Sequence, residues 1–200
     1  MSKQPLFEKT IELINAANSE DPNTEMADDK EWPKELLYSH RMENMIQRFA
    51  PDADEVQKIA VHGQHIQRWQ SPRSDYTMDR KGYHQWRTNL YKFHAEQTCL
   101  LMQQAGYDEL SIERVKLAIG KKNLKSNIDT QMLENIAALV FIEHYMQAFV
   151  DKYPEYDEAK WIDIILKTWK KMTESAQQFA LSGAIKLPEP LIPLIKKSIT

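Results

Sequence analysis

The sequence predicts an all-α fold, and three observations support this prediction. Apolar residues recur at the three- and four-residue spacing of amphipathic helices along most of the 200-residue chain. Only 5 glycines are present, which is too few for a turn-rich β-sandwich or a glycine-rich phosphate loop. Hydrophobic residues make up 42% of the chain and charged residues 28%, enough for a sizeable core. We therefore expect one compact helical bundle.

The first three helices are expected between recognisable start and stop signals. Pro5 opens the first helix, because proline is favoured in a first turn. An acidic, polar loop follows at 18–31, and Pro33 opens the second helix. The turn at 51–54 supplies an N-cap for a third helix, which we expect to run through Trp69.

The second half of the chain continues the helical pattern. Further helices are expected over 80–104, 108–119, 129–150 and 158–181. Gly106 is expected to end the first of these helices, and Asp108 is expected to cap the next one. The C-terminal stretch KLPEPLIPLIKK contains three prolines within six residues, a spacing that favours extended chain over helix. The sequence therefore predicts one helical domain over 1–183 and an extended, proline-rich arm over 184–200.

Composition and charge exclude several classes of protein. A single cysteine, Cys99, rules out a disulfide framework and any multi-cysteine zinc or iron–sulfur site. The net charge of −3 gives no overall attraction to nucleic acid or to an anionic membrane. No apolar run approaches the roughly 20 residues of a membrane span, and the start MSKQPLFEK lacks the apolar stretch of a signal peptide. We expect a cytoplasmic protein that binds neither membrane nor nucleic acid, and a homodimer is left open.

Two histidines are expected on apolar helix faces. His65 falls between Val61 and Trp69 at four-residue spacing, on one line of the third predicted helix. His94 follows Phe93 in the fourth predicted helix and has a similar apolar setting. A buried polar group without a partner costs about 1–3 kcal/mol. These imidazoles must therefore be hydrogen-bonded or bound to a metal.

The sixth predicted helix carries Glu134, Asn135 and Glu143 on a largely apolar surface. A buried carboxylate normally takes up a proton, pairs with a cation or binds a metal ion. In helical bundles, metal sites are built from side chains that project inward from facing helices. We predict a metal or catalytic cluster drawn from His65, His94, Glu134, Asn135 and Glu143. The alternative is a set of satisfied core residues.

A basic, aromatic stretch extends from residue 68 to residue 92. It contains six basic and two acidic residues, whereas residues 1–35 contain four lysines and nine acidic residues. Arginine binds phosphate and carboxylate through two parallel hydrogen bonds and stacks on aromatic rings. The residues expected to bind a small phosphorylated or otherwise anionic ligand are Arg68, Arg73, Arg80, Arg87, Tyr76 and Trp86. The alternative is that these arginines pair with the acidic N-terminal third.

The same stretch carries a resemblance to a known family. The run HGQHIQRWQSPRSDYTMDRKGYHQWRTNLYKFHAEQ, with LLYSHRMENMI before it and QMLENIAALVFIEHY after it, resembles a family of domains of unknown function. The resemblance covers roughly residues 5–180. Some fungal members of that family carry a glutamyl-tRNA synthetase label, but this chain has no nucleotide-binding βαβ pattern.

A more distant similarity is to HD-domain metal-dependent phosphohydrolases. It rests on FHAEQTCLLMQQAGYDELSIERVKLAI, on IAVHGQHI and on MLENIAALV. The resemblance implies that His65 is the histidine of the His-Asp dyad, that His94 is a further ligand and that Asn135 holds a late aspartate position. His40 could stand for the opening histidine. Ile66 replaces the dyad aspartate, so a mononuclear site and a metal-free pocket both stay open.

The expected function is a metal-dependent hydrolase of HD-like fold that acts on a small phosphorylated or anionic substrate. A divalent metal ion would lower the pKa of a bound water toward 7 and so create a hydroxide nucleophile. Its expected ligands are His65, His94 and Asn135, and Glu134 or Glu143 would supply a carboxylate. The arginines would neutralise charge that develops in the transition state. The alternative is a non-catalytic ligand-binding or scaffold module with a hydrogen-bonded polar core.

Overall fold

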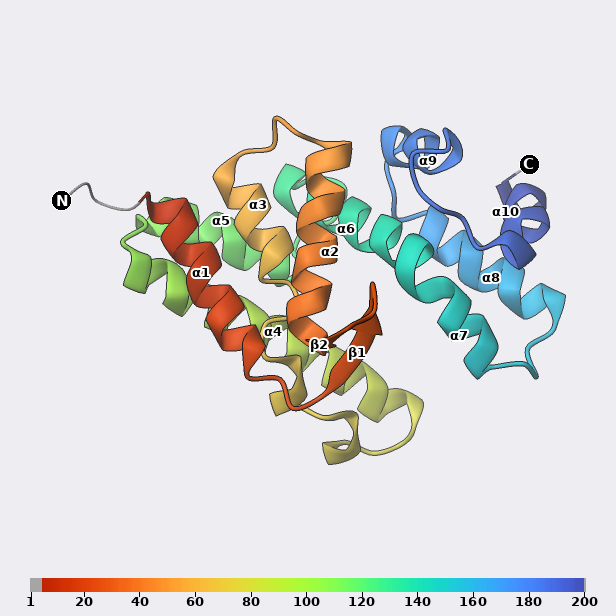
Figure 1. Cartoon of the computed structure of the whole chain (residues 1–200), viewed down its shortest axis with the longest axis horizontal. Coiled ribbons are helices and arrows are strands. Elements are labelled where there is room, and N and C mark those ends of the chain that lie inside the picture. The colour runs from red at the N-terminus through yellow and green to blue at the C-terminus, as the bar shows by residue number, and fades with distance from the viewer. Residues whose placement is uncertain (1–4, 200) are drawn as a thin grey trace. The chain divides into compact units, whose positions relative to one another are not determined.

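The computed structural model describes residues 5–199 and is mainly α-helical (Figure 1). Its described part contains ten α-helices and one two-stranded antiparallel sheet, which confirms the predicted fold class. The chain divides into two compact units, Met1–Leu133 (unit 1) and Glu134–Thr200 (unit 2). No helix within residues 5–199 has both the length and the apolar content needed to cross a membrane.

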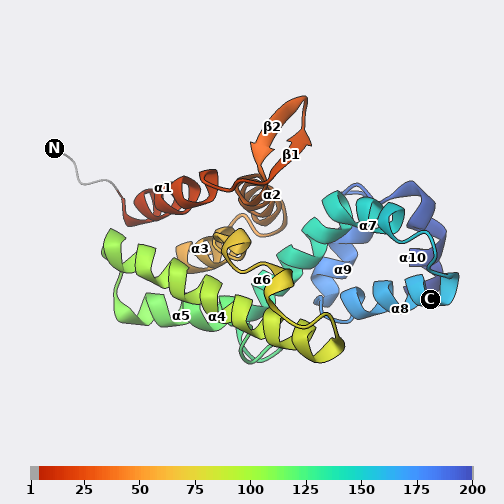
Figure 2. The ribbon, with the colours of Figure 1, turned by 90° about the horizontal axis from the view of Figure 1, so that it is seen from below.

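Unit 1 is a bundle of helices with a small hairpin at the start of α2. Helix α5 packs against α4 and α3, while α1 packs against α2, α3 and α4. Figure 2 shows the hairpin projecting beyond α2. In chain order the elements are α1 (Leu6–Ser19), β1 (Thr24–Ala27), β2 (Lys30–Pro33), α2 (Lys34–Phe49), α3 (Glu55–His62), two 3₁₀ turns (Arg68–Gln70 and Arg73–Asp75), α4 (Arg80–Ala105) and α5 (Glu109–Ile119).

Helix ends in unit 1 follow the expected capping chemistry. The carboxylate of Asp54 accepts a hydrogen bond from Gln57 N at 2.9 Å and caps α3. The carboxylate of Asp108 does the same for α5 through Ser111 N at 2.9 Å. Gly106 ends α4 with a φ of 112°, in the left-handed region that glycine tolerates best. The predicted caps of these helices are confirmed.

The third helix is shorter than predicted. Helix α3 ends at His62, and the chain then turns until Gln67, which has a left-handed φ of 49°. The backbone N–H of Gln67 donates to Asn18 Oδ1 at 2.9 Å, a partner that sequence spacing does not reveal. The prediction of a helix through Trp69 is therefore wrong, and His65 lies on a turn instead of on a helix face.

The predicted loop at 18–31 contains β1 and the first two residues of β2, which together form a hairpin. Ala27 pairs with Lys30 at its closed end, and the two linking residues, Asp28 and Asp29, have φ values of 50° and 58°. Two successive left-handed residues form the turn that matches the twist of antiparallel strands. The Asp-Asp pair lacks the glycine that usually signals such a turn, so the sequence pattern did not predict it.

Unit 2 begins within a long helical segment. Helix α6 (Ile128–Val140) continues through a π-helical turn (Phe141–Tyr145) into α7 (Met146–Lys152), much as the predicted helix over 129–150. The segment starts one residue earlier than expected because Asn127 Oδ1 accepts both Asp129 N and Thr130 N at 2.9 Å. The remaining elements are α8 (Glu158–Trp169), α9 (Glu174–Leu181), a 3₁₀ turn (Glu189–Leu191) and α10 (Ile192–Ile199).

Two predictions for unit 2 need correction. The helix expected over 158–181 is split, because Thr173 caps α9 through Ala176 N at 3.4 Å. The extended arm contains helix α10, which packs against α8. Pro193 lies in the first turn of α10. Backbone N–H groups in a first turn make no intrahelical hydrogen bond, so a proline is tolerated there. Leu191 and Ile195 are both 2% exposed, so this segment contributes to the core of unit 2.

Candidate functional site

The turn after α3 is held by a buried network of polar side chains. Asn18 Nδ2 donates to Ser39 Oγ at 2.9 Å, and Ser39 Oγ donates to the carbonyl of His62 at 2.9 Å. Asn18 also accepts the backbone N–H of Gln67, and both Asn18 and Ser39 are fully buried. A satisfied polar network of this kind fixes one conformation of the chain that it binds. It therefore fixes the backbone on both sides of His65.

The imidazole of His65 lies between an acidic and a basic side chain. Its Nδ1 lies 3.4 Å from Oε2 of Glu35, and its Nε2 lies 3.0 Å from Nη1 of Arg68. The same Nη1 lies 3.4 Å from Nδ1. A guanidinium only donates, so we assign the closer nitrogen, Nε2, as the acceptor, which places the ring proton on Nδ1 facing Glu35. The ring of Tyr38 stacks on His65 at a centroid distance of 4.0 Å. The side chain of His65 is 21% exposed, so solvent reaches it.

His94 presents a free nitrogen lone pair inside unit 1. Its Nδ1 lies 2.8 Å from the carbonyl oxygen of Ile66, so Nδ1 carries the proton and donates it. Nε2 is buried and has no hydrogen-bond partner among residues 5–199. Burial lowers the pKa of His94 to about 3. The rings of His65 and His94 are 5.8 Å apart between centroids, which places two neutral imidazoles side by side.

Glu35 is the carboxylate that faces His65, and no sequence pattern marked it as a candidate. It lies in the first turn of α2 and is 6% exposed. Its backbone N–H donates to Asp21 Oδ2 at 3.0 Å. Burial raises the pKa of Glu35, and the nearby positive charge of Arg68 opposes that rise. Its Oε2 is buried and has no hydrogen bond to another residue of 5–199, and it lies 3.4 Å from Nδ1 of His65.

We call Glu35, His65, Arg68 and His94 the His65 cluster. Burial holds the pKa of His65 well below its usual value, and four nearby cations lower it further. Those cations are Arg68, Lys121, Arg87 and Lys34. The cluster therefore combines a neutral imidazole with a positive potential, and a small anion is the ligand that such a potential attracts.

The predicted anion-binding residues divide into two groups. Arg68 belongs to the His65 cluster, and its guanidinium lies 5.2 Å from the ring centroid of Trp86, whose Nε1 donates to Ser71 O. Arg87 donates to the hydroxyl groups of two tyrosines, Tyr83 and Tyr91.

The other group is engaged with the loop before α4 or exposed. Arg73 donates to the backbone carbonyls of Tyr76 and Asp79 at 3.1 and 3.3 Å. Tyr76 accepts a hydrogen bond from Asn89 Nδ2 at 3.2 Å. Arg80 lies exposed at the first position of α4.

The three candidate residues of the sixth predicted helix belong to unit 2 and have structural partners there. Asn135 accepts from Thr173 N at 2.9 Å and donates to Thr173 Oγ1 at 3.0 Å. Glu134 lies 3.7 Å from Lys171 Nζ. Glu143 accepts from Lys186 N at 3.0 Å and lies 3.4 Å from His144.

His40 lies outside the His65 cluster. It is on α2, with its ring centroid 5.4 Å from that of Trp32 and 6.4 Å from that of His62. His62 in turn contacts Asn15 Oδ1 through Nε2 at 2.7 Å. His40 and His62 are therefore part of the contact between α1, α2 and α3.

The residues around His65 fit an anion better than a divalent cation. The same four positive charges that lower the pKa of His65 repel a metal ion from its ring. Within the described residues, no group of three or more His, Cys, Asp or Glu side chains is placed to hold a metal. The divalent metal ion therefore stays a prediction of the sequence.

Comparisons with known proteins identify a family. A family model described as "Domain of unknown function (DUF4202)" matches residues 8–195, nearly the whole chain. No curated protein and no solved structure matches. The similarity to HD-domain phosphohydrolases therefore stays a prediction as well.

Proposed function

We propose, for this chain that belongs to the DUF4202 family, that unit 1 hydrolyses a small phosphorylated or otherwise anionic substrate at the His65 cluster. The observation that carries the proposal is the arrangement of His65. Its Nδ1 faces Glu35 at 3.4 Å, and its Nε2 lies 3.0 Å from Arg68. A carboxylate that orients an imidazole and stabilises its charged form is a recurring arrangement for general-base catalysis.

The positive charge of the cluster supports an anionic substrate. A phosphoryl group would bind Arg68 through two parallel hydrogen bonds, which are stronger than a single bond to a neutral nitrogen. Arg68 would then leave His65 Nε2, which would become available as a base.

The proposed hydrolysis uses the ring nitrogens of His65 and His94. His65 Nε2 takes a proton from water, the water oxygen attacks phosphorus, and the bond from phosphorus to the leaving oxygen breaks. The leaving oxygen receives the proton back from the His65 imidazolium, which Glu35 stabilises while it exists. The free lone pair of His94 Nε2 would accept a hydrogen bond from the attacking water.

A second candidate is a binding module without chemistry. It is favoured by the contact between Arg68 and His65 Nε2, because a base that already accepts a hydrogen bond is not free to take a proton. Under this candidate the anion binds Arg68, while His65 and His94 serve only as polar neighbours.

The experiment is an assay of inorganic phosphate release from a panel of small phosphorylated compounds. The full chain is assayed with a chelator, with Mg²⁺ and with Mn²⁺, which also tests the predicted metal. His65→Gln should abolish the release, whereas His84→Gln, an exposed histidine on α4, should not change it. Phosphate binding without turnover would favour the second candidate. Activity that survives His65→Gln would contradict the proposal.

A further inference from the structure

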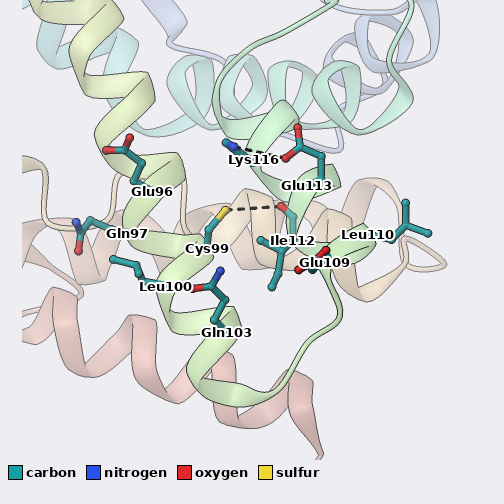
Figure 3. Close-up of a pocket in the computed structure, with 10 residues that line it drawn as sticks. All are labelled: Glu96, Gln97, Cys99, Leu100, Gln103, Glu109, Leu110, Ile112, Glu113 and Lys116. Carbon is teal, nitrogen blue, oxygen red and sulfur yellow. Dashed lines mark hydrogen bonds and ion pairs between the residues drawn. The ribbon is translucent and has the colours of Figure 1, made fainter.

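A groove between α4 and α5 is lined by ten residues (Figure 3), none of which belongs to the His65 cluster. Its volume is about 850 Å³. Cys99 and Ile112, each 8% exposed, lie against one another, with Cys99 Sγ 3.6 Å from the carbonyl oxygen of Ile112. Leu100 on α4 is 55% exposed, and Leu110 on α5 is 75% exposed. The groove therefore has a buried apolar base and two leucines that leave much of their surface to solvent.

The charged residues that line this groove are mainly acidic. They are Glu96, Glu109, Glu113 and Lys116. Glu113 and Lys116 lie 3.5 Å apart, and both side chains are more than half exposed, so this ion pair holds them only weakly. Glu96 lies 3.7 Å from Lys92, and these side chains are exposed too. A partner with several positive charges could therefore replace these contacts at little cost.

We propose that this groove binds a basic amphipathic helix of a partner protein. An apolar helix face presents side chains at i and i+4 about 6 Å apart, and such a face lies in a hydrophobic groove in many complexes. Leucine-type side chains of the partner would cover Leu100 and Leu110, while lysines or arginines on either side would meet Glu109 and Glu113. Helix α5 has 11 residues, so it offers about three helical turns of contact.

The charge decides the kind of partner. An acidic helix would place carboxylates against three glutamates, and like charges in contact lower affinity. A basic helix is attracted by the same glutamates, and that attraction weakens as added salt screens it.

The test uses a synthetic helix of about four turns, with leucine on one face and lysine on the other. A control peptide has glutamate in place of every lysine. Each peptide is titrated into the ¹⁵N-labelled full chain, and amide shifts are followed. The lysine peptide should shift resonances of α4 and α5, and the glutamate peptide should not. Added salt should weaken the binding.

Two pairs of variants locate the contact. Leu110→Asp should weaken binding of the lysine peptide by about tenfold, whereas Leu181→Asp, a leucine of α9 that is 48% exposed, should leave it unchanged. Glu109→Lys with Glu113→Lys should reverse the preference between the peptides. The matched control is Glu8→Lys with Glu12→Lys, an exposed pair at the same spacing on α1.

The proposal is overturned by any of four results. These are no shifts with the lysine peptide, equal binding of both peptides, shifts outside α4 and α5, or equal effects of Leu110→Asp and Leu181→Asp. Because no residue of the His65 cluster lines the groove, phosphate release should be the same in all four variants.

Discussion

Unit 1 and unit 2 both bury ionisable or amide side chains, but these side chains have different partners. In unit 2, Asn135 accepts the backbone N–H of Thr173, which caps α9, and Glu143 accepts that of Lys186, which lies in the loop after α9. In unit 1, buried polar atoms of Glu35 and His94 have no hydrogen bond to another residue of 5–199, and four cations lie near His65.

This difference separates a structural polar residue from a candidate site. A buried amide that both accepts from and donates to the residue at a helix start stabilises the fold through those hydrogen bonds. A buried lone pair or carboxylate without a hydrogen bond is unfavourable, and a ligand that binds it relieves that cost. Structural residues and candidate site residues are both buried. Their hydrogen-bond partners therefore distinguish the two kinds.

Glu35→Gln should have the largest effect on activity. Glutamine keeps the shape but cannot stabilise a charged His65, so we expect phosphate release to fall by about 10²–10⁴. Glu134→Gln, the matched change in unit 2, should leave activity unchanged. Burial raises the pKa of Glu35, so its ionised form is disfavoured in the folded state, and Glu35→Gln should unfold no more easily at pH 7. An equal loss of activity in both variants would contradict the comparison.

Acid should destabilise unit 1 through its neutral histidines. The pKa of His94 is about 3 in the folded state and near 6.5 in the unfolded chain. Its contribution to stability is therefore complete above pH 6.5 and is lost as the pH falls toward 3. At pH 5 this histidine alone lowers the free energy of unfolding by about 2 kcal/mol relative to pH 7.

Urea unfolding at pH 7 and pH 5 measures this dependence. The difference between the two pH values should be smaller in His94→Gln than in the unchanged protein, and His84→Gln should not alter it. The same pH dependence in all three proteins would show that His94 is not held neutral.

Asn135→Ala should lower stability without affecting the site. The variant loses both hydrogen bonds to Thr173, the residue that caps α9. We expect the free energy of unfolding to fall by about 1–2 kcal/mol. Thermal unfolding gives the loss, and an unchanged rate of phosphate release confirms that it is structural. A large loss of activity would instead indicate that Asn135 belongs to the functional site, as the sequence predicted.

Arg68→Lys should have a smaller effect, on affinity. Lysine keeps the charge but cannot form two parallel hydrogen bonds or stack flat on Trp86. We expect inorganic phosphate to bind about tenfold more weakly, which calorimetry can measure. Arg48→Lys, at an exposed position near the end of α2, is the control, and equal affinities in the two variants would remove Arg68 from the site.

The sequence predicted the helical class and most helix starts because capping and apolar spacing are local. Asp54 and Asp108 cap their helices as expected. The end of α3 was not predictable in the same way, because Gln67 is held by Asn18, which is distant in sequence. The break at Thr173 likewise depends on Asn135, a partner from another helix.

The candidate site was predicted only in part for the same reason. His65, His94 and Arg68 were selected from apolar spacing and local charge, and the structure brings them together. Glu35 resembles an ordinary acidic residue in a first helical turn, so no pattern marked it. Its burial depends on the turn after α3, which long-range hydrogen bonds position. Conversely, apolar spacing selected Asn135 and Glu143 as candidate site residues. Their backbone hydrogen-bond partners could not be recognised from the spacing of residues in the sequence.

The most direct test of the central claim is a titration of the ¹⁵N-labelled full chain with inorganic phosphate, followed at the imidazole nitrogens. The claim is that the His65 cluster binds an anion whereas the buried polar groups of unit 2 are structural. The nitrogens of His65 and His94 should shift in a saturable way, and those of His144 in unit 2 should not. Unchanged signals of His65 and His94, or an equal shift of His144, would contradict the account.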